Sequence, residues 1–304
     1  MIRYIILICI GSIALSSCNR CSSEKTDSWN DIPQEVIDGN NFEDIVVPVD
    51  VINQMVNVSS PVETAALIKG LKIPFNRDYL ADTKFTNSYS TSFKKALGLG
   101  VFGADMGYLN MYEKPTLVID YLSSVNSLAD GLQVGQFFDF KTLKRIATNK
   151  ENLDSLMVIS QQSFNKIDNY LKQTNRGSLS VVIIAGVWLE GFYLSTRVYQ
   201  DSRHSRIRET IGEQKIVMSN LMVLLEIFKK DSNIAALIKD FNEIKVLFND
   251  VVITVVMGEE PIPIVKNGVV TFIQSDKQTV EMSDETLGAI IEKVQSIRKK
   301  IVEG

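Results

Sequence analysis

The stretch Leu179–Leu194, LSVVIIAGVWLEGFYL, decides the fold class, because it contains the most apolar run beyond the N-terminus. That run, Val181 to Leu189, ends at Glu190 and is far shorter than the roughly 20 residues that a membrane-spanning helix needs. We therefore expect a helix from about Leu179 to Tyr199, buried in the core of a globular protein.

A second stretch, Ser92–Leu109 (SFKKALGLGVFGADMGYL), has the same character. In both stretches an acid stands one helical turn before a tyrosine: Asp105 before Tyr108, and Glu190 before Tyr193. This similarity suggests an internal duplication, in which two related three-helix halves form one bundle. The sequence alone does not decide whether the duplication exists.

Helical periodicity dominates from Ser59 to about Val256 and predicts a mainly all-α, multi-helix bundle. The expected helices, besides the one at 179–199, cover about 60–70, 88–112, 116–132, 139–147, 153–171, 207–230 and 234–248. Short connections favour antiparallel neighbours. The first helix has a strong start signal, because Ser60 and Glu63 flank Pro61 as a capping box.

The C-terminal part changes pattern. Ile262–Val265 and Val269–Ile273 flank an Asn-Gly pair, which predicts a small β-hairpin, and Gln278–Met282 is a candidate third strand. A final helix is expected to start at Ser283 or Asp284. Its last turns carry three cations that complement the helix dipole: Arg298, Lys299 and Lys300.

The N-terminus has the layout of a secretory signal peptide over residues 1–17: Arg3, an apolar run from Ile5 to Leu15, and small residues before Cys18. The sequence Leu15-Ser-Ser-Cys18 resembles the lipobox of bacterial lipoproteins, which implies that Cys18 is lipidated and becomes the mature N-terminus. Asn19 favours the outer membrane by resemblance to lipoprotein sorting in Gram-negative bacteria. The expected localisation is therefore the cell envelope, lipid-anchored and facing the periplasm.

The domain organisation follows from these signals. We expect a signal peptide, a lipidated flexible tether, a helical domain, and a hairpin with its helix packed on the same domain, over residues 1–17, 18–44, 45–257 and 258–304.

Ser60–Glu63, Ser92–Leu97 with Gly103–Asp105, and Gly186–Gly191 resemble segments of uncharacterised helical envelope lipoproteins of Gram-negative bacteria. The resemblance covers most of the mature chain. It implies the compartment and the fold class, and it carries no known activity or catalytic residue.

Composition bounds the function. The chain is 45% hydrophobic and 22% charged, as expected of a packed globule, and its net charge of −4 with no basic stripe argues against a nucleic-acid partner. Of three cysteines, Cys9 leaves with the signal peptide and Cys18 carries the lipid, so Cys21 stays alone and no intramolecular disulfide is expected.

The sequence lacks the residues that several kinds of catalytic or metal site need. His204 is the single histidine, which argues against zinc sites, Ser-His-Asp triads and di-iron bundles, so neither a metal nor a cofactor is expected. Gly98, Gly100 and Gly103 match G-x-G-x-x-G, but they follow a helical pattern rather than a strand. We interpret Gly100, Gly103 and Gly107 as a face that a second helix approaches closely, and we expect Gly186 and Gly191 to serve the same end in the second stretch.

The candidate site consists of Asp105, Tyr108, Glu190 and Tyr193. A buried carboxylate needs a partner, so each acid either makes a structural bond, the favoured interpretation, or lines a polar ligand pocket. The favoured function is a non-enzymatic envelope lipoprotein that binds or scaffolds a protein or small molecule. The alternative is a carboxylate-dependent enzyme, or a metal or small-ligand binder, that uses Asp105 and Glu190, and the sequence does not decide between them.

Overall fold

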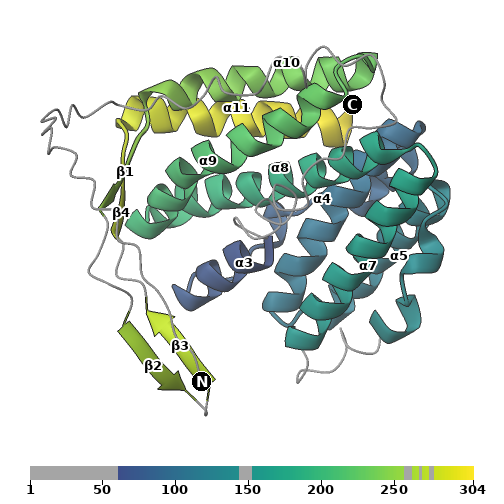
Figure 1. The fold of residues 1–304 in the computed structure, drawn as a ribbon, viewed down its shortest axis with the longest axis horizontal. Coiled ribbons are helices and arrows are strands. Elements are labelled where there is room, and N and C mark those ends of the chain that lie inside the picture. Colours follow the sequence, from purple (N-terminus) through teal and green to yellow (C-terminus); the bar gives the residue numbers. More distant parts are fainter. Residues whose placement is uncertain (1–60, 144–152, 257–261, 267–268, 274–276) are drawn as a thin grey trace, which may run out of the picture. The chain divides into compact units, whose positions relative to one another are not determined.

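The chain folds around two long helices, α4 (Ser92–Met111) and α8 (Gly177–Ser202), which pack against each other in the interior (Figure 1). A computed structural model describes residues 61–143, 153–256, 262–266, 269–273 and 277–304. The predictions for the signal peptide, Cys18, the tether, the Ser60 cap and the domain start at residue 45 lie outside these residues.

Local chemistry sets the ends of both helices. The Thr91 hydroxyl oxygen accepts a hydrogen bond from the backbone N–H of Lys94 at 3.1 Å and caps α4. Helix α8 ends where Arg203 takes up the left-handed conformation, with φ of 52°. The predicted helices at 88–112 and 179–199 are therefore confirmed, with ends shifted by a few residues.

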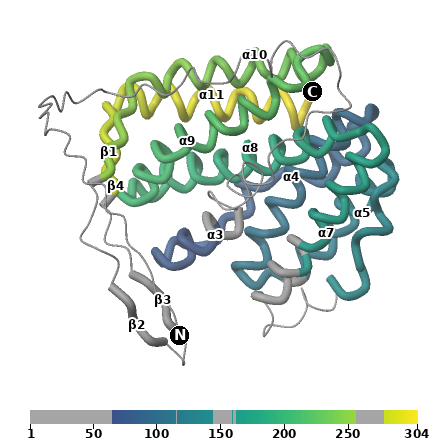
Figure 2. Tube along the Cα trace, viewed as in Figure 1, coloured from purple at the N-terminus to yellow at the C-terminus, as the bar shows by residue number. Residues whose placement is uncertain are grey.

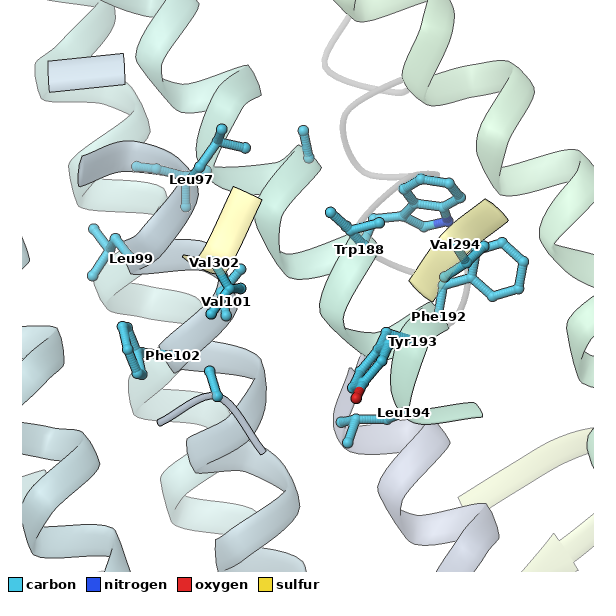
Figure 3. Close-up of a cluster of buried hydrophobic side chains, with 14 of the residues drawn as sticks. Leu97, Leu99, Val101, Phe102, Trp188, Phe192, Tyr193, Leu194, Val294 and Val302 are labelled. Atoms are coloured by element: carbon cyan, nitrogen blue, oxygen red, sulfur yellow. The ribbon is translucent and has the colours of Figure 1, made fainter. Parts of the chain in front are cut away.

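The core includes residues of these two helices and of α11 (Asp284–Glu303). Figure 3 shows the three contributions together: Leu97, Leu99, Val101 and Phe102 from α4, Trp188, Phe192, Tyr193 and Leu194 from α8, and Val294 and Val302 from α11. Helix α8 is long and apolar enough to cross a membrane by length and composition, yet 72% of its most apolar window is buried inside the protein. It is the core helix that the sequence predicts.

Glycine lets α4 and α8 touch backbone to backbone. A Cβ on Gly100 would overlap the carbonyl oxygen of Ile183 and lie 2.6 Å from the backbone nitrogen of Val187. A Cβ on Gly186 would overlap the carbonyl oxygen of Leu97. The predicted close approach is therefore made at these two glycines. It is wrong for Gly103, where a Cβ would have nothing within 4 Å.

Five further helices surround this pair: α3 (Pro61–Gly70), α5 (Pro115–Gly131), α7 (Leu153–Gln173), α9 (Ser205–Ile227) and α10 (Ser232–Leu247). Helix α5 packs on α4, α7 and α9 pack on α8, and α3 contacts both central helices. Asp139 caps a short helical segment, since its carboxylate accepts from the N–H of Thr142 at 2.9 Å. Short 3₁₀ turns complete the connections: η1 (Arg77–Tyr79), η2 (Thr83–Ser88), η3 (Gly135–Phe137) and η4 (Phe248–Asp250).

The C-terminal strands form two nested antiparallel pairs. The inner pair is the predicted hairpin, β2 (Ile262–Lys266) with β3 (Val269–Ile273), in the register Lys266 to Val269. The outer pair joins β1 (Val252–Val256) to β4 (Lys277–Glu281). Two expectations were wrong here. Residues 252–256 are a strand rather than the end of a helical region, because their β-branched side chains favour extended backbone. The third strand pairs with β1 and not with the hairpin.

Helix α11 returns to the bundle after β4. Ser283 caps it, with the hydroxyl oxygen accepting from the N–H of Thr286 at 3.0 Å. Figure 2 shows α11 running beside α10, and α11 also contacts α8 and α4. The buried face of α11 therefore covers the core. The predicted fold class, mainly all-α with a small C-terminal sheet and a final helix, is confirmed.

The order of elements agrees with two halves, since α4 and α8 are each followed by two flanking helices. The partners of the two central acids differ, as described below, so any such symmetry does not extend to their contacts. The duplication stays a prediction.

The glycine crossing gives the first testable prediction. Gly100→Ala and Gly186→Ala should each destabilise the protein by about 1–3 kcal/mol, because the added methyl group meets backbone that cannot move aside. Gly103→Ala is the matched control in the same helix and should stabilise by up to about 1 kcal/mol, since its methyl group has free space. Urea unfolding of the three variants measures this. Equal effects at Gly100 and Gly103 would refute the close crossing.

Candidate functional site

Asp105 and Glu190 face each other across the α4–α8 contact. Asp105 follows Gly100 along α4, and Glu190 follows Gly186 along α8. Both side chains are 0% exposed. The structure therefore brings together the two acids that the sequence singled out, and it seals them from solvent.

Glu190 has a cationic partner. The Nε and Nη2 atoms of Arg298 donate to the two carboxylate oxygens of Glu190 at 2.9 and 2.8 Å, a bidentate ion pair between α11 and α8. The Arg298 side chain is 8% exposed, and its guanidinium lies 4.3 Å from the centre of the Tyr193 ring. Burial alone lowers the pKa of Arg298, but the adjacent Glu190 charge more than offsets it, so the pKa is raised and the group stays charged.

Asp105 has no cation of its own. Its Oδ2 accepts from the backbone N–H of Ala81 at 2.8 Å, in the segment between η1 and η2, and its Oδ1 meets no donor among the described residues. Its carboxyl also lies in hydrogen-bond contact with that of Glu190. Two ionised carboxylates cannot share a hydrogen bond, so we infer that Asp105 keeps its proton and that Oδ1–H donates to Glu190.

Electrostatics supports this assignment. Burial first, and then the negative charge of Glu190, raise the pKa of the Asp105 carboxyl well above its usual range, and Arg298 offsets only part of the rise. With Asp105 neutral, Glu190 and Arg298 leave the buried cluster without net charge. An ionised Asp105 would place a second, unpaired anion in the core, which is costly.

The two candidate tyrosines lie in different surroundings. Tyr193 belongs to the cluster through Arg298. Tyr108 packs in an aromatic group, with its ring centre 5.5 Å from Phe75 and 4.9 Å from Tyr112, and its hydroxyl oxygen accepts from the N–H of Asn76 at 3.2 Å. Burial raises the pKa of both tyrosines. Tyr108 therefore anchors the loop after α3 rather than joining the acid pair.

Arg298 was not predicted as a partner of Glu190, because its place in the last turns of α11 was interpreted as a complement to the helix dipole. A signal was present. Leu287, Ile291 and Val294 form a buried stripe on α11, and Arg298 continues it at a spacing of four residues. No comparable sequence pattern places Ala81 or the buried Tyr89 beside the acids, because both residues lie in irregular segments.

Other sequence features have structural roles in the described residues. The G-x-G-x-x-G glycines lie inside α4 and not at a strand–helix turn, so they form no phosphate-binding loop. His204 caps α9, with Nδ1 accepting from the N–H of Arg206 at 3.1 Å. Within the part of the chain that is described, no group of three His, Cys, Asp or Glu side chains is placed to hold a metal ion.

A pocket of about 330 Å³ lies between α4, α10 and α11, and neither Asp105 nor Glu190 lines it. Both acids are 0% exposed, so neither meets the solvent that general acid–base catalysis would need.

Comparison of the chain with protein-family models, curated proteins and solved structures finds no match.

The second prediction contrasts two isosteric substitutions. Glu190→Gln should cost about 3–5 kcal/mol, because it leaves the buried Arg298 cation without its anion. A neutral partner of Glu190 would make the same substitution mild, because an amide keeps much of the hydrogen bonding. Asp105→Asn should change stability by less than about 1 kcal/mol, since the amide accepts from Ala81 and donates to Glu190 as the protonated acid does.

Chemical denaturation of both variants measures these effects. The double variant Glu190→Gln/Arg298→Met is the control, and it should recover much of the loss by removing the stranded cation. Equally mild single variants would show that Glu190 and Arg298 are not a buried ion pair.

The third prediction concerns pH. The pKa of Asp105 is raised in the folded protein, so above the unfolded value of 3.8 the folded state binds a proton that the unfolded state has lost. Its contribution to stability is complete below that pH and declines as pH rises towards the folded pKa. The unfolding free energy of the wild type should therefore fall relative to that of Asp105→Asn from about pH 4 upward. Urea titrations of both proteins at a series of pH values test this, and a constant difference would mean that Asp105 is ionised when folded.

Proposed function

We propose that this protein is an exported lipoprotein with a non-enzymatic binding or scaffolding role, held at the outer membrane by acyl chains on Cys18 and facing the periplasm. The N-terminal sequence supports the anchor, since a basic residue, an apolar run and small residues precede Cys18. Several acyl chains on one residue give stable attachment, because each buried CH₂ contributes about 0.8 kcal/mol.

The single observation that carries the non-enzymatic part is the state of Asp105 and Glu190. Both are 0% exposed, and Glu190 uses both oxygens to hold Arg298. These contacts join α4, α8 and α11 to the segment around Ala81, so the acids serve the packing of the core.

One observation favours the alternative, a carboxylate-dependent enzyme or small-ligand binder. Strongly raised carboxyl pKa values in acid pairs are frequent at catalytic sites, and Asp105 has such a value. Catalysis would require α4 and α8 to open and admit a substrate. Their backbone contact at Gly100 and Gly186 opposes such opening, so we favour the packing role.

The partner is proposed to be a protein or a small molecule. The net charge of −4 and the absence of a basic stripe from the sequence disfavour nucleic acid.

The fourth prediction tests the anchor. After expression in a Gram-negative host with a clickable fatty acid, the wild-type protein should incorporate the label and fractionate with membranes, while Cys18→Ala should lose both properties. Cys21→Ala is the matched control, because it removes a cysteine three residues away and should leave labelling intact. Label retained by Cys18→Ala, or lost in Cys21→Ala, would contradict the proposed lipid site.

A further inference from the structure

Strand β1 has one edge without a strand partner among the described residues. It pairs with β4 on one side, and no other described strand joins these two. In an antiparallel pair, the residues that form no hydrogen bonds within the pair direct their backbone N–H and C=O groups outward. The outer edge of β1 therefore presents a row of hydrogen-bonding groups with which another extended strand can pair.

The residues of β1 suit such pairing, because all five are β-branched and uncharged. Val252 and Val255 are 54% and 53% exposed, and Val246, in the last turn of α10, is 63% exposed. Only two other large apolar side chains are exposed in the described part of the chain, Ile119 and Ile216. Apolar exposure is thus concentrated in the strand and in the helix end just before it.

The two edges of the β1–β4 sheet differ in charge. The sequence of β4 begins with Lys277 and ends with Glu281, and charged residues on an edge strand oppose pairing with a further strand. Strand β1 carries no charge. Of the two edges, that of β1 is therefore the one suited to a partner.

The bundle holds β1 in its extended conformation. Helix α9 covers one face of the sheet, since a Cβ on Gly212 would overlap the Val280 side chain of β4. Val280 lies opposite Ile253 in the register, and both residues pack against the core. The edge is therefore preformed, which lowers the entropy cost of pairing.

We propose that two copies of this chain associate through the outer edges of β1 and form a continuous antiparallel sheet in the order β4-β1-β1-β4. A twofold axis at Thr254 places this residue opposite its own copy. The same axis places Val252 opposite Val256, and Ile253 opposite Val255, of the second copy. Every cross-strand pair is then β-branched and no charges meet, so the edge is complementary to itself.

The contact is small. A pair of five-residue strands buries less than the roughly 1,200–2,000 Å² of stable interfaces, so the association is weak and transient. A covalent cross-link that traps the pair is therefore the suitable readout. The proposal adds self-association to the proposed binding role, and it depends neither on that role nor on the lipid anchor.

Cysteine cross-linking of the full chain tests the twofold register. In a Cys21→Ser background, Thr254→Cys should form an intermolecular disulfide on mild oxidation, because directly opposite residues have Cα atoms about 4.5–5.5 Å apart, within disulfide range. Thr279→Cys is the matched control. Thr279 is the exposed partner of Thr254 in β4, and it would lie about 14 Å from its copy, three strand spacings away.

Non-reducing gels measure the dimer above the level of Cys21→Ser alone, which accounts for disulfides through the remaining cysteines. Thr254→Cys should give at least about fivefold more dimer than Thr279→Cys, given these distances. Equal amounts would overturn the proposal. A dimer from Thr279→Cys alone would assign the contact to β4 and overturn it as well, and so would the absence of a dimer from either variant.

A charge on the edge provides the second test. Added to Thr254→Cys, Val255→Lys should reduce the dimer about fivefold, because it places an ammonium opposite Ile253 of the second copy. Ile119→Lys is the control, at an exposed apolar residue on α5, and should leave the dimer unchanged. Both positions are exposed, so both variants should fold, which thermal melts check. Equal dimer in the two lysine variants would refute the β1 edge as the contact.

Discussion

The bidentate bond between Glu190 and Arg298 is the constraint on which the core depends. It places a full charge of each sign where solvent does not reach, so every neighbouring group must keep the sum at zero. Asp105 meets this condition by remaining protonated. Hydrophobic packing draws α4, α8 and α11 together, but the ion pair and the protonated acid restrict them to one arrangement, because few other arrangements satisfy all these polar atoms.

Backbone contact adds a second restriction of a different kind. The crossing at Gly100 and Gly186 brings two helices closer than side chains normally permit, and this closeness brings carboxyl groups from opposite helices within reach of each other. Gly98 serves another purpose, since it gives room for the Tyr89 ring. Gly98 and Gly100 stand two residues apart in the sequence and yet serve different contacts.

Much of the helical framework could be predicted from sequence, because caps, breaks and apolar periodicity are local signals. Ser283 caps α11 as the sequence predicts, whereas Thr91 and Arg203 mark ends of α4 and α8 that lie a few residues from the predicted ones. The strand β1 was not predicted, since its partner β4 comes about 20 residues later and the β-branched side chains of Val252–Val256 are only one part of what favours extended backbone there. The acids were found because a charge within an apolar helix needs a partner. The difference between their partners was not predicted, because Arg298 and Ala81 approach the two acids from distant parts of the chain.

Glu190 and Arg298 stand 108 residues apart in the sequence, so their bond ties the last helix of the chain to its middle. The α4–α8 crossing joins residues almost as distant, Gly100 and Gly186, so the core is built from contacts between remote parts of the chain. Detachment of α11 would leave the Glu190 carboxylate beside Asp105 without a cation. The bundle therefore depends on its last helix for charge balance as well as for apolar packing.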